Sequence, residues 1–410
     1  MQNPTWIRAR DLDNWAHDPA ARGLLPELIE RLVKATVPSE RREICDFASE
    51  AENHRQGFDG RTVVTTGTEF VPAGICLWEM GCDENPRAKA ERDYTTRVTE
   101  HKERVASGET EDFTAASFTF VTPRDWHAKK GSKGKGTKPQ AMADWANAKS
   151  GEKVFKQVCS LDSNRLEQWI REAPAVGLWL AKAMGKPVDG LDDVKSRWED
   201  IQASLQRRLP HDVFLVSRGA VAEAFKNWLN GNPDLLAVRA PSAWEVVAVF
   251  AAWIESLPDA ERNSHTARSI VVENKDSWPE LAESTHPLIL IVAPQLEPDV
   301  ELFRRAARKG HHVLCHADAR AGSGQGATEL PRMRRYELQK ALEKSGLDEP
   351  TSAKLANAAG GTFTILRRIF AKDRSIQTPA WADDPTIGAL LLAGSWEDER
   401  LGDRAAIEAL

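Results

Sequence analysis

The sequence predicts an α/β protein with two sheet-containing regions followed by helices. In the first half, short apolar runs separated by turns indicate a mixed sheet flanked by helices. In residues 209–328, strand patterns alternate with helix patterns, which is typical of a mainly parallel sheet. The chain has 410 residues. Because single hydrophobic cores rarely grow past roughly 250–300 residues, more than one domain is expected.

The bulk composition is that of an ordinary globular protein. Hydrophobic residues make up 41% of the chain and charged residues 28%, and the formal net charge is -6. This balance gives no overall nucleic-acid signature, so DNA binding would need a local basic patch. The longest apolar runs are too short to cross a bilayer, and the N-terminus carries no apolar signal segment. We therefore expect a cytoplasmic protein without membrane contact.

Residues 1–190 form the first predicted domain. Apolar residues at helical spacing predict one helix over residues 9–36. After a β-rich run that follows Gly60, the patterns predict strands at 75–81, 117–123 and 154–162, a helix at 86–106, and a helical pair from Ser163 that breaks at Pro174.

The rest of the chain predicts a linker helix, a second sheet and a helical end. Residues 191–208 are expected to be the linker helix, and residues 209–328 the second α/β domain. Its expected strands are 213–217, 235–240, 269–273, 288–293 and 311–315, and its expected helices are 219–230, 242–256 and 298–309. Residues 329–375 predict a helical lid. Residues 376–410 look like the start of a further helical region that is cut inside a helix, so we expect a fragment of a longer protein.

The most informative residue is Glu79, a lone acid in the apolar strand ICLWEMG. Burying a carboxylate without a partner or a metal is unfavourable. Asp59 lies between two glycines, just before the β-rich run that precedes this strand. Lys89 lies on the predicted helix 86–106 that follows the strand. Acids at the ends of adjacent strands can bind Mg²⁺, and a nearby lysine can stabilise phosphate charge. The alternative is structural, with Glu79 paired to an arginine or capping a backbone turn.

Lys89, Asp93 and Arg97 share one face of the predicted helix, because they are spaced four residues apart. Lys89 can enter the site only if that face covers the strand that carries Glu79. The alternative is a solvated ladder of surface charges, and the spacing alone favours it.

The basic stretch AKKGSKGKGTKPQ, residues 128–140, is a candidate contact for DNA phosphates. Five lysines in ten residues give an attraction that depends on salt and not on base sequence. A solvated loop without function explains the composition equally well. The five are Lys129, Lys130, Lys133, Lys135 and Lys138.

The strings GFDG, VPAGICLWEMG, KAERDYTTR and FTFVTPRDW together resemble the PD-(D/E)xK restriction-endonuclease-like fold, in particular its Mrr-like branch. With LDSNRLEQWIREAPAVGLWLA they are similar to N-terminal effector domains of large bacterial anti-phage proteins, over about residues 5–185. The resemblance implies that Asp59 and Glu79 are the metal-binding acids. The lysine of the family stands two residues after the second acid, where this chain has Gly81, and a lysine that has moved to the next helix would be Lys89. The preceding segment offers further polar groups in Glu50, Glu52 and Gln56.

The second α/β region resembles a P-loop NTPase of the STAND or AAA type with its lid, over roughly residues 210–372. The similarity includes the ending GLDEPTSAKLANAAGGTFTILRRI. The phosphate-binding motif is missing, since PSAWEVV follows the strand LLAVRA where GxxxxGK[ST] would be needed. PQLEPD follows LILIVA in place of an acidic pair for Mg²⁺. We therefore expect a degenerate domain that binds no nucleotide and regulates or assembles the protein.

Together, the site residues and the resemblance imply a DNA endonuclease that uses Mg²⁺ or Mn²⁺ and acts as the effector of a bacterial defence protein. Its expected partners are DNA, further copies of the chain in a homo-oligomer, and a C-terminal sensor region of the same protein. The alternative is a DNA-binding or scaffold protein that keeps the nuclease fold without its activity, and Gly81 at the lysine position favours it.

Overall fold

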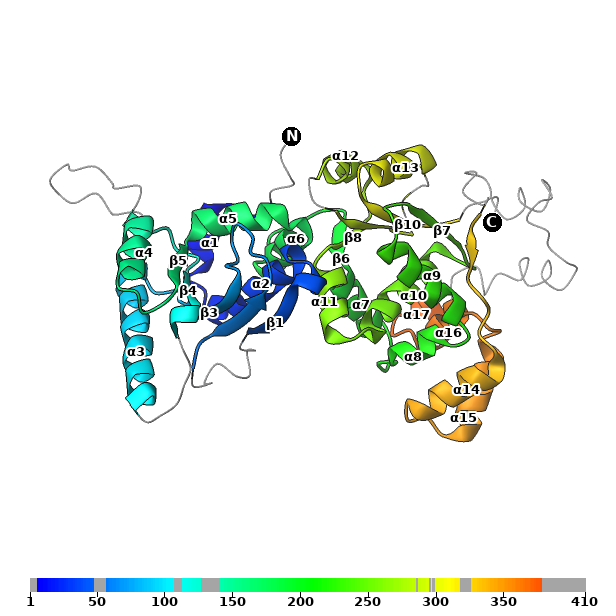
Figure 1. Ribbon diagram of the computed structural model, residues 1–410. Coiled ribbons are helices and arrows are strands. Elements are labelled where there is room, and N and C mark those ends of the chain that lie inside the picture. Colours follow the sequence, from blue (N-terminus) through cyan, green and yellow to red (C-terminus); the bar gives the residue numbers. More distant parts are fainter. Residues whose placement is uncertain are drawn as a thin grey trace, which may run out of the picture. The chain divides into compact units, whose positions relative to one another are not determined.

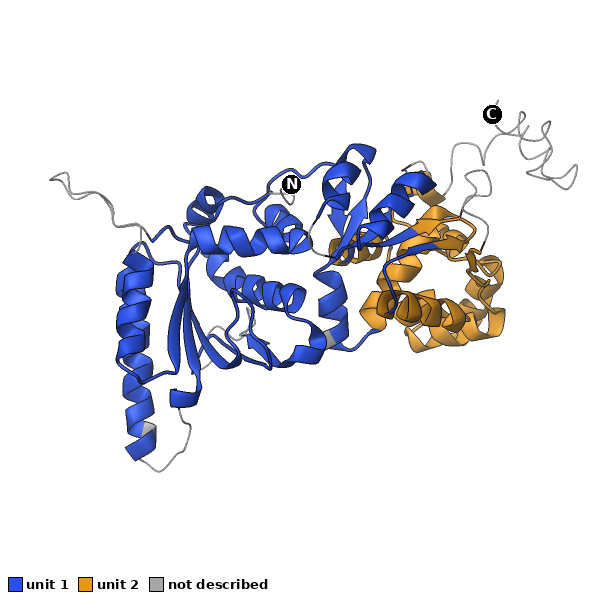
Figure 2. Ribbon diagram, turned by 45° about the horizontal axis from the view of Figure 1, so that its top comes forward, with its two compact units in different colours: residues 1–194, 231–236, 257–314 blue, residues 195–230, 237–256, 315–410 orange. Residues whose placement is uncertain are grey.

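A computed structural model describes residues 6–47, 57–106, 113–126, 141–284, 287–294, 296, 299–317 and 326–377. The chain divides into two compact units (Figure 2). Unit 1 comprises residues 1–194, 231–236 and 257–314, and unit 2 comprises residues 195–230, 237–256 and 315–410. The architecture is mixed α/β with parallel strands in both sheets, as predicted (Figure 1).

The first sheet contains five strands in the order β1-β2-β3-β4-β5. β1 pairs with β2 and β2 with β3 in antiparallel fashion, whereas β3, β4 and β5 run parallel. The sheet is therefore mixed, as predicted. The strands are β1 (Arg42–Phe47), β2 (Gly60–Val64), β3 (Gly74–Met80), β4 (Ser117–Val121) and β5 (Gln157–Leu161).

Helices cover both faces of this sheet. Buried side chains of α1 (Ala9–Trp15), α2 (Pro19–Thr36), α5 (Ser163–Glu172) and α6 (Pro174–Ala183) form one core with Trp78 and Met80. Side chains of α3 (Pro86–Ala106) and α4 (Ala141–Gly151) form a second core with Leu77, Phe118 and Phe120. Successive residues of a strand point to opposite faces, so β3 contributes to both cores in turn.

Two details of this region differ from the prediction. The single helix expected over 9–36 is two helices, because the Asp18 side chain accepts the Ala20 N–H and Pro19 begins a new helix without an N–H to donate. β1 was not predicted. Half of its sequence REICDF is charged and half is exposed, as is common on edge strands, so it lacks the apolar run that marks β3. The predicted break at Pro174 is confirmed.

The second sheet contains six strands in the order β11-β7-β10-β9-β8-β6. The strand pairs β11–β7, β10–β9 and β8–β9 are parallel. Among the described strand pairs of this sheet with a defined residue register, only β6–β8 is antiparallel. The predicted mainly parallel sheet is confirmed. The strands are β6 (Leu191–Asp193), β7 (Leu235–Arg239), β8 (Ser269–Val272), β9 (Ile289–Val292), β10 (His312–His316) and β11 (Thr328–Glu329).

The predicted linker helix over 191–208 is wrong in its first part, because residues 191–193 form β6. The predicted strand over 213–217 is also wrong, since His211–Leu215 is helix α8. Val213 and Phe214 are fully buried in it. A short apolar run looks the same in a buried strand and in a buried helix, so periodicity could not separate them.

The remaining helices connect and follow the second sheet. They are α7 (Val194–Ala203), α9 (Gly219–Asn230), α10 (Ala243–Ser256), α11 (Asp259–Thr266), α12 (Trp278–Ala282), α13 (Val300–Arg308), α14 (Arg335–Lys344), α15 (Glu349–Ala358), α16 (Phe363–Phe370) and α17 (Arg374–Gln377). The helical character predicted for residues 329–375 is therefore confirmed apart from β11. Within the described residues, no helix combines the length and the apolar character that a bilayer crossing requires.

Candidate functional site

Asp59 and Glu79 lie opposite each other at one end of the first sheet. β2 and β3 pair with Gly60 opposite Trp78, so the next step of the same antiparallel register sets Asp59 against Glu79. Asp59 Oδ2 accepts the backbone N–H of Met80 at 2.7 Å. This bond fixes the Asp59 carboxylate beside the strand that carries the second acid.

The side chain of Glu79 points toward α3 because of the alternation along β3. Trp78 belongs to the core on the opposite face, where its indole N–H donates to Thr62 Oγ1 at 3.0 Å. Glu79 shares the α3 face with Leu77, and only 3% of its surface is exposed. The apolar strand therefore buries this carboxylate under a helix.

Helix α3 presents its charged face to the two acids. Arg97 Nε lies 2.5 Å from Glu79 Oε1, and Arg97 Nη2 donates to the carbonyl oxygen of Gly57. Lys89 Nζ lies 2.6 Å from Asp93 Oδ2 on the same helix. The ladder is thus turned toward the strand and not only toward solvent. Glu79 has the arginine partner that the structural alternative expected.

Lys89 fills the space beside Gly81. A Cβ atom at Gly81 would lie 2.8 Å from Lys89 Cγ and 3.0 Å from Lys89 Cε. The aliphatic part of Lys89 therefore passes over the strand position at which the resemblance expects a lysine. A side chain at position 81 and the present conformation of Lys89 exclude each other.

Burial raises the pKa of both acids, and the charge of Asp59 raises that of Glu79 further. Burial, and then the negative charge of Asp59, raises the pKa of Glu79 to about 8, while Arg97 acts in the opposite direction. Burial also raises the pKa of Asp59, against the Met80 N–H and the positive charge of Lys89. Because burial is the largest cause of both shifts, the neighbouring cations do not offset the cost of removing the two carboxylates from water.

Two carboxylates are available to a divalent cation. Among the contacts of the described residues, Asp59 uses Oδ2 and Glu79 uses Oε1, so Oδ1 and Oε2 make no hydrogen bond there. No group of three or more His, Cys, Asp or Glu side chains within the described residues is placed to hold a metal ion. Two carboxylates fit Mg²⁺, which often takes one or two and completes its shell with waters and substrate phosphate.

Several predicted site residues lie outside the described part of the chain. They are Glu50, Glu52 and Gln56 before β2 and the five lysines of the basic loop, Lys129, Lys130, Lys133, Lys135 and Lys138. Arg97, by contrast, contacts Glu79 directly. The sequence predicted only that Arg97 shares a helix face with Lys89 and Asp93. The spacing of Lys89, Asp93 and Arg97 was the signal that pointed to it.

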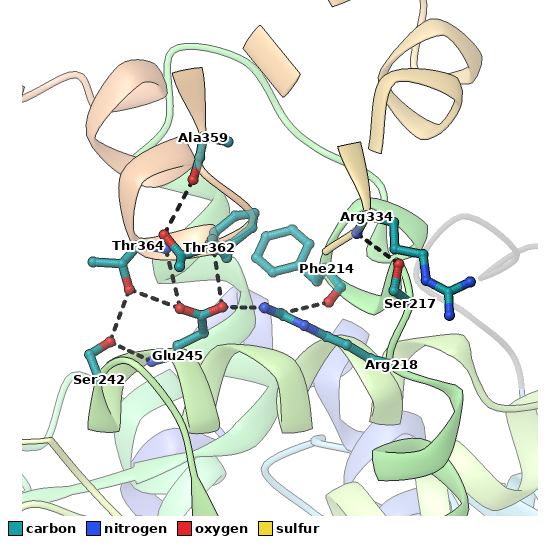
Figure 3. A network of polar contacts seen from close by, with 10 residues as sticks. Phe214, Ser217, Arg218, Ser242, Glu245, Arg334, Ala359, Thr362 and Thr364 are labelled. Carbon is teal, nitrogen blue, oxygen red and sulfur yellow. Dashed lines mark hydrogen bonds and ion pairs between the residues drawn. The ribbon is translucent and has the colours of Figure 1, made fainter. Parts of the chain in front are cut away.

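At the start of α10, where the second region would need a phosphate-binding loop, a buried acid is fully engaged with other parts of the chain. Glu245 is 0% exposed. Its carboxylate accepts bonds from Arg218, from the Phe363 N–H at 3.0 Å and from the Thr364 hydroxyl at 3.0 Å (Figure 3). Ser242 caps the same turn by accepting the Glu245 N–H at 3.2 Å. The carboxylate and the N-terminus of α16 thus fill this position.

No protein-family model matches the chain, and no curated protein matches it either.

Proposed function

We propose that the first region is a divalent-metal-dependent nuclease that hydrolyses DNA phosphodiester bonds. The observation that carries the proposal is the placement of Asp59 and Glu79 opposite each other at the end of two paired strands, with one oxygen of each free of hydrogen bonds among the described residues. Asp59 and Glu79 would hold Mg²⁺ or Mn²⁺, and Lys89 would assist.

A bound divalent ion would supply charge neutralisation for the phosphate and would activate a water molecule as the nucleophile. The chain itself orients the ligands. The Met80 N–H holds Asp59 in place, and the apolar surroundings of Glu79 keep bulk water away from its carboxylate. Lys89, half-buried across Gly81, would place its ammonium group toward the phosphate and stabilise the developing negative charge.

The second region would regulate or assemble this nuclease without using a nucleotide. Support comes from the start of α10, because a fully buried carboxylate there opposes the approach of phosphate charge. The N–H groups of Phe363 and Thr364, which a phosphate could use, already bind Glu245. In the proposed context, a bacterial anti-phage defence protein, this region would control when the nuclease acts on DNA.

A second candidate function is DNA binding without cleavage. The Arg97–Glu79 ion pair favours it, because an arginine on the metal-binding acid can replace the metal as its permanent partner. The absence of a side chain at Gly81 favours it as well.

Plasmid cleavage in Mg²⁺ or Mn²⁺ tests the proposal. We expect cleavage by the wild-type chain and its loss in Asp59→Ala and Glu79→Ala, and cleavage that survives both substitutions would refute the assignment. If the isolated chain needs an activator for cleavage, titration calorimetry of Mg²⁺ binding to the same three proteins tests the metal site instead. Only the wild type should then bind the ion, and no binding by the wild type would favour the non-catalytic alternative.

Lys89 has a rescue experiment of its own. Lys89→Ala should reduce cleavage roughly 100-fold or more, the range that loss of one stabilising donor causes in other enzymes. It also opens the space beside Gly81, so adding Gly81→Lys should restore a large part of the rate. Gly81→Lys alone should not raise the rate, because Lys89 still fills that space. A double variant as inactive as Lys89→Ala would contradict the role of Lys89.

A further inference from the structure

Arg97 makes four contacts, three of them with the candidate site. Its guanidinium bonds to Glu79 Oε1, to the carbonyl oxygen of Gly57 and, at 2.8 Å, to Glu100 Oε2. It also lies over the ring of Phe58, 5.1 Å from the centroid. Gly57 and Phe58 directly precede Asp59, so Arg97 touches the segments that carry both acids.

Arg97 is the cation that contacts Glu79. The other cation on this face of α3, Lys89, pairs with Asp93. The Arg97 side chain is 16% exposed and that of Glu79 is 4% exposed, so the pair is largely removed from water. In such surroundings, a divalent ion on Glu79 and the guanidinium would repel each other strongly.

We propose that Arg97 is an internal counter-cation that occupies Glu79 until a divalent metal ion enters, so that the ion and the Arg97–Glu79 contact exclude each other. This inference rests on the proposed metal site and concerns its regulation. The contact leaves Glu79 Oε2 open, but the positive charge of Arg97 opposes the ion until the ion displaces it. Glu100, exposed at the helix surface, is a second carboxylate to which the displaced guanidinium can remain bonded.

The test is Mg²⁺ titration calorimetry at pH 9 on the full chain. Arg97→Gln and Arg97→Met remove the charge, and Met keeps the aliphatic packing in case Gln disturbs folding. Both should bind Mg²⁺ at least about tenfold more tightly than the wild type, because Coulomb's law gives about tenfold for a divalent ion and a single charge about 6 Å apart even in water, and more in drier surroundings. Arg87→Gln is the matched control, because Arg87 is exposed on the same helix, and it should leave the affinity unchanged.

A double-mutant comparison shows whether Arg97 acts through Glu79. In a Glu79→Gln background, which lacks the carboxylate that would bind the ion, loss of Arg97 should restore no Mg²⁺ binding. Equal or weaker binding by both Arg97 variants, with normal binding by the wild type, overturns the inference and leaves the metal site intact. If neither the wild type nor any Arg97 variant binds Mg²⁺, the proposed function itself fails, and the inference fails with it.

Discussion

The two units each contain a buried glutamate bonded to an arginine, and the two pairs are built differently. Glu245 in unit 2 is 0% exposed and uses both carboxylate oxygens, one for Arg218 and Phe363 and the other for Thr364. Glu79 in unit 1 is 3% exposed and uses one oxygen, for Arg97, while the other oxygen makes no hydrogen bond among the described residues.

The surroundings of the two carboxylates differ as well. Glu245 faces hydrogen-bond donors, including the first N–H groups of α16, which favour a negative charge. Glu79 faces a second acid, Asp59, whose charge contributes to raising its pKa. A carboxylate saturated with donors serves the structure, whereas a carboxylate with an open oxygen beside a like charge is suited to a cation.

The largest expected effect comes from Glu245→Gln. The amide NH₂ group would face donors that now bond to the carboxylate, and Arg218 would lose its counter-charge in a buried place. We expect a loss of about 3–5 kcal/mol in the free energy of unfolding, as for other broken buried ion pairs. Urea unfolding measures it, with Glu223→Gln on the exposed face of α9 as the control. A loss below about 1 kcal/mol would mean that the Glu245 carboxylate, like that of Glu79, does not serve mainly to stabilise the fold.

At alkaline pH, Glu79→Gln should raise the free energy of unfolding, whereas Glu245→Gln should lower it. An unfolded glutamate loses its proton near pH 4.5, whereas folded Glu79 keeps it until about pH 8. Unfolding therefore releases a proton between these values, and the stability of the wild type falls as the pH rises through this window. Each pKa unit corresponds to about 1.4 kcal/mol, so the contribution amounts to a few kcal/mol.

Glu79→Gln removes that decline. Urea unfolding at pH 5 and pH 9 should show a smaller difference in the variant than in the wild type, and the variant should be the more stable protein at pH 9. Glu100→Gln is the control, because Glu100 also bonds to Arg97 but is 43% exposed. Equal pH dependence in the wild type and Glu79→Gln would mean that Glu79 is ionised in the fold at neutral pH and that Arg97 fully compensates its burial.

Much of the fold was predictable because its signals are local. Helix α9 has the predicted bounds, and the break between α5 and α6 lies at the predicted Pro174. Alternation of helices and strands correctly indicated the parallel sheet. The failures were short segments in which local signals are ambiguous. The strand predicted over 213–217 proved to be the end of helix α8 and a turn, and the charged edge strand β1 has no apolar run at all.

The candidate site was predictable only in part. The cost of burying a lone acid in an apolar strand singled out Glu79, and helix periodicity placed Lys89, Asp93 and Arg97 on one face. Which of these side chains reaches Glu79 depends on the packing of α3, which periodicity does not give. The Glu245 cluster was not predicted, because Thr364 lies 119 residues from Glu245 in the sequence and no local pattern joins them.

Asp59→Asn isolates the effect of the neighbouring charge on Glu79. Asn keeps an oxygen for the Met80 N–H but carries no charge, so the pKa of Glu79 should fall toward its ordinary value. The loss of stability between pH 5 and pH 9 should shrink by about 1 kcal/mol, the interaction of two unit charges about 4 Å apart in water. Urea unfolding measures it, and Asp46→Asn on the exposed edge strand is the control. An unchanged pH dependence of stability would mean that the charge of Asp59 does not act on Glu79.

Thr364→Val is expected to have the smallest effect. It removes one donor from Glu245 and also the contact of 3.1 Å between the Thr364 and Ser242 hydroxyls, but it retains the shape of the side chain. Because Arg218 and two N–H groups remain on the carboxylate, the free energy of unfolding should fall by only about 0.5 kcal/mol, the lower end of what one hydrogen bond contributes. Thr364→Ser keeps the hydroxyl and should lose less. A fall as large as that of Glu245→Gln would mean that this hydroxyl, and not the number of donors, distinguishes the saturated glutamate from the open one.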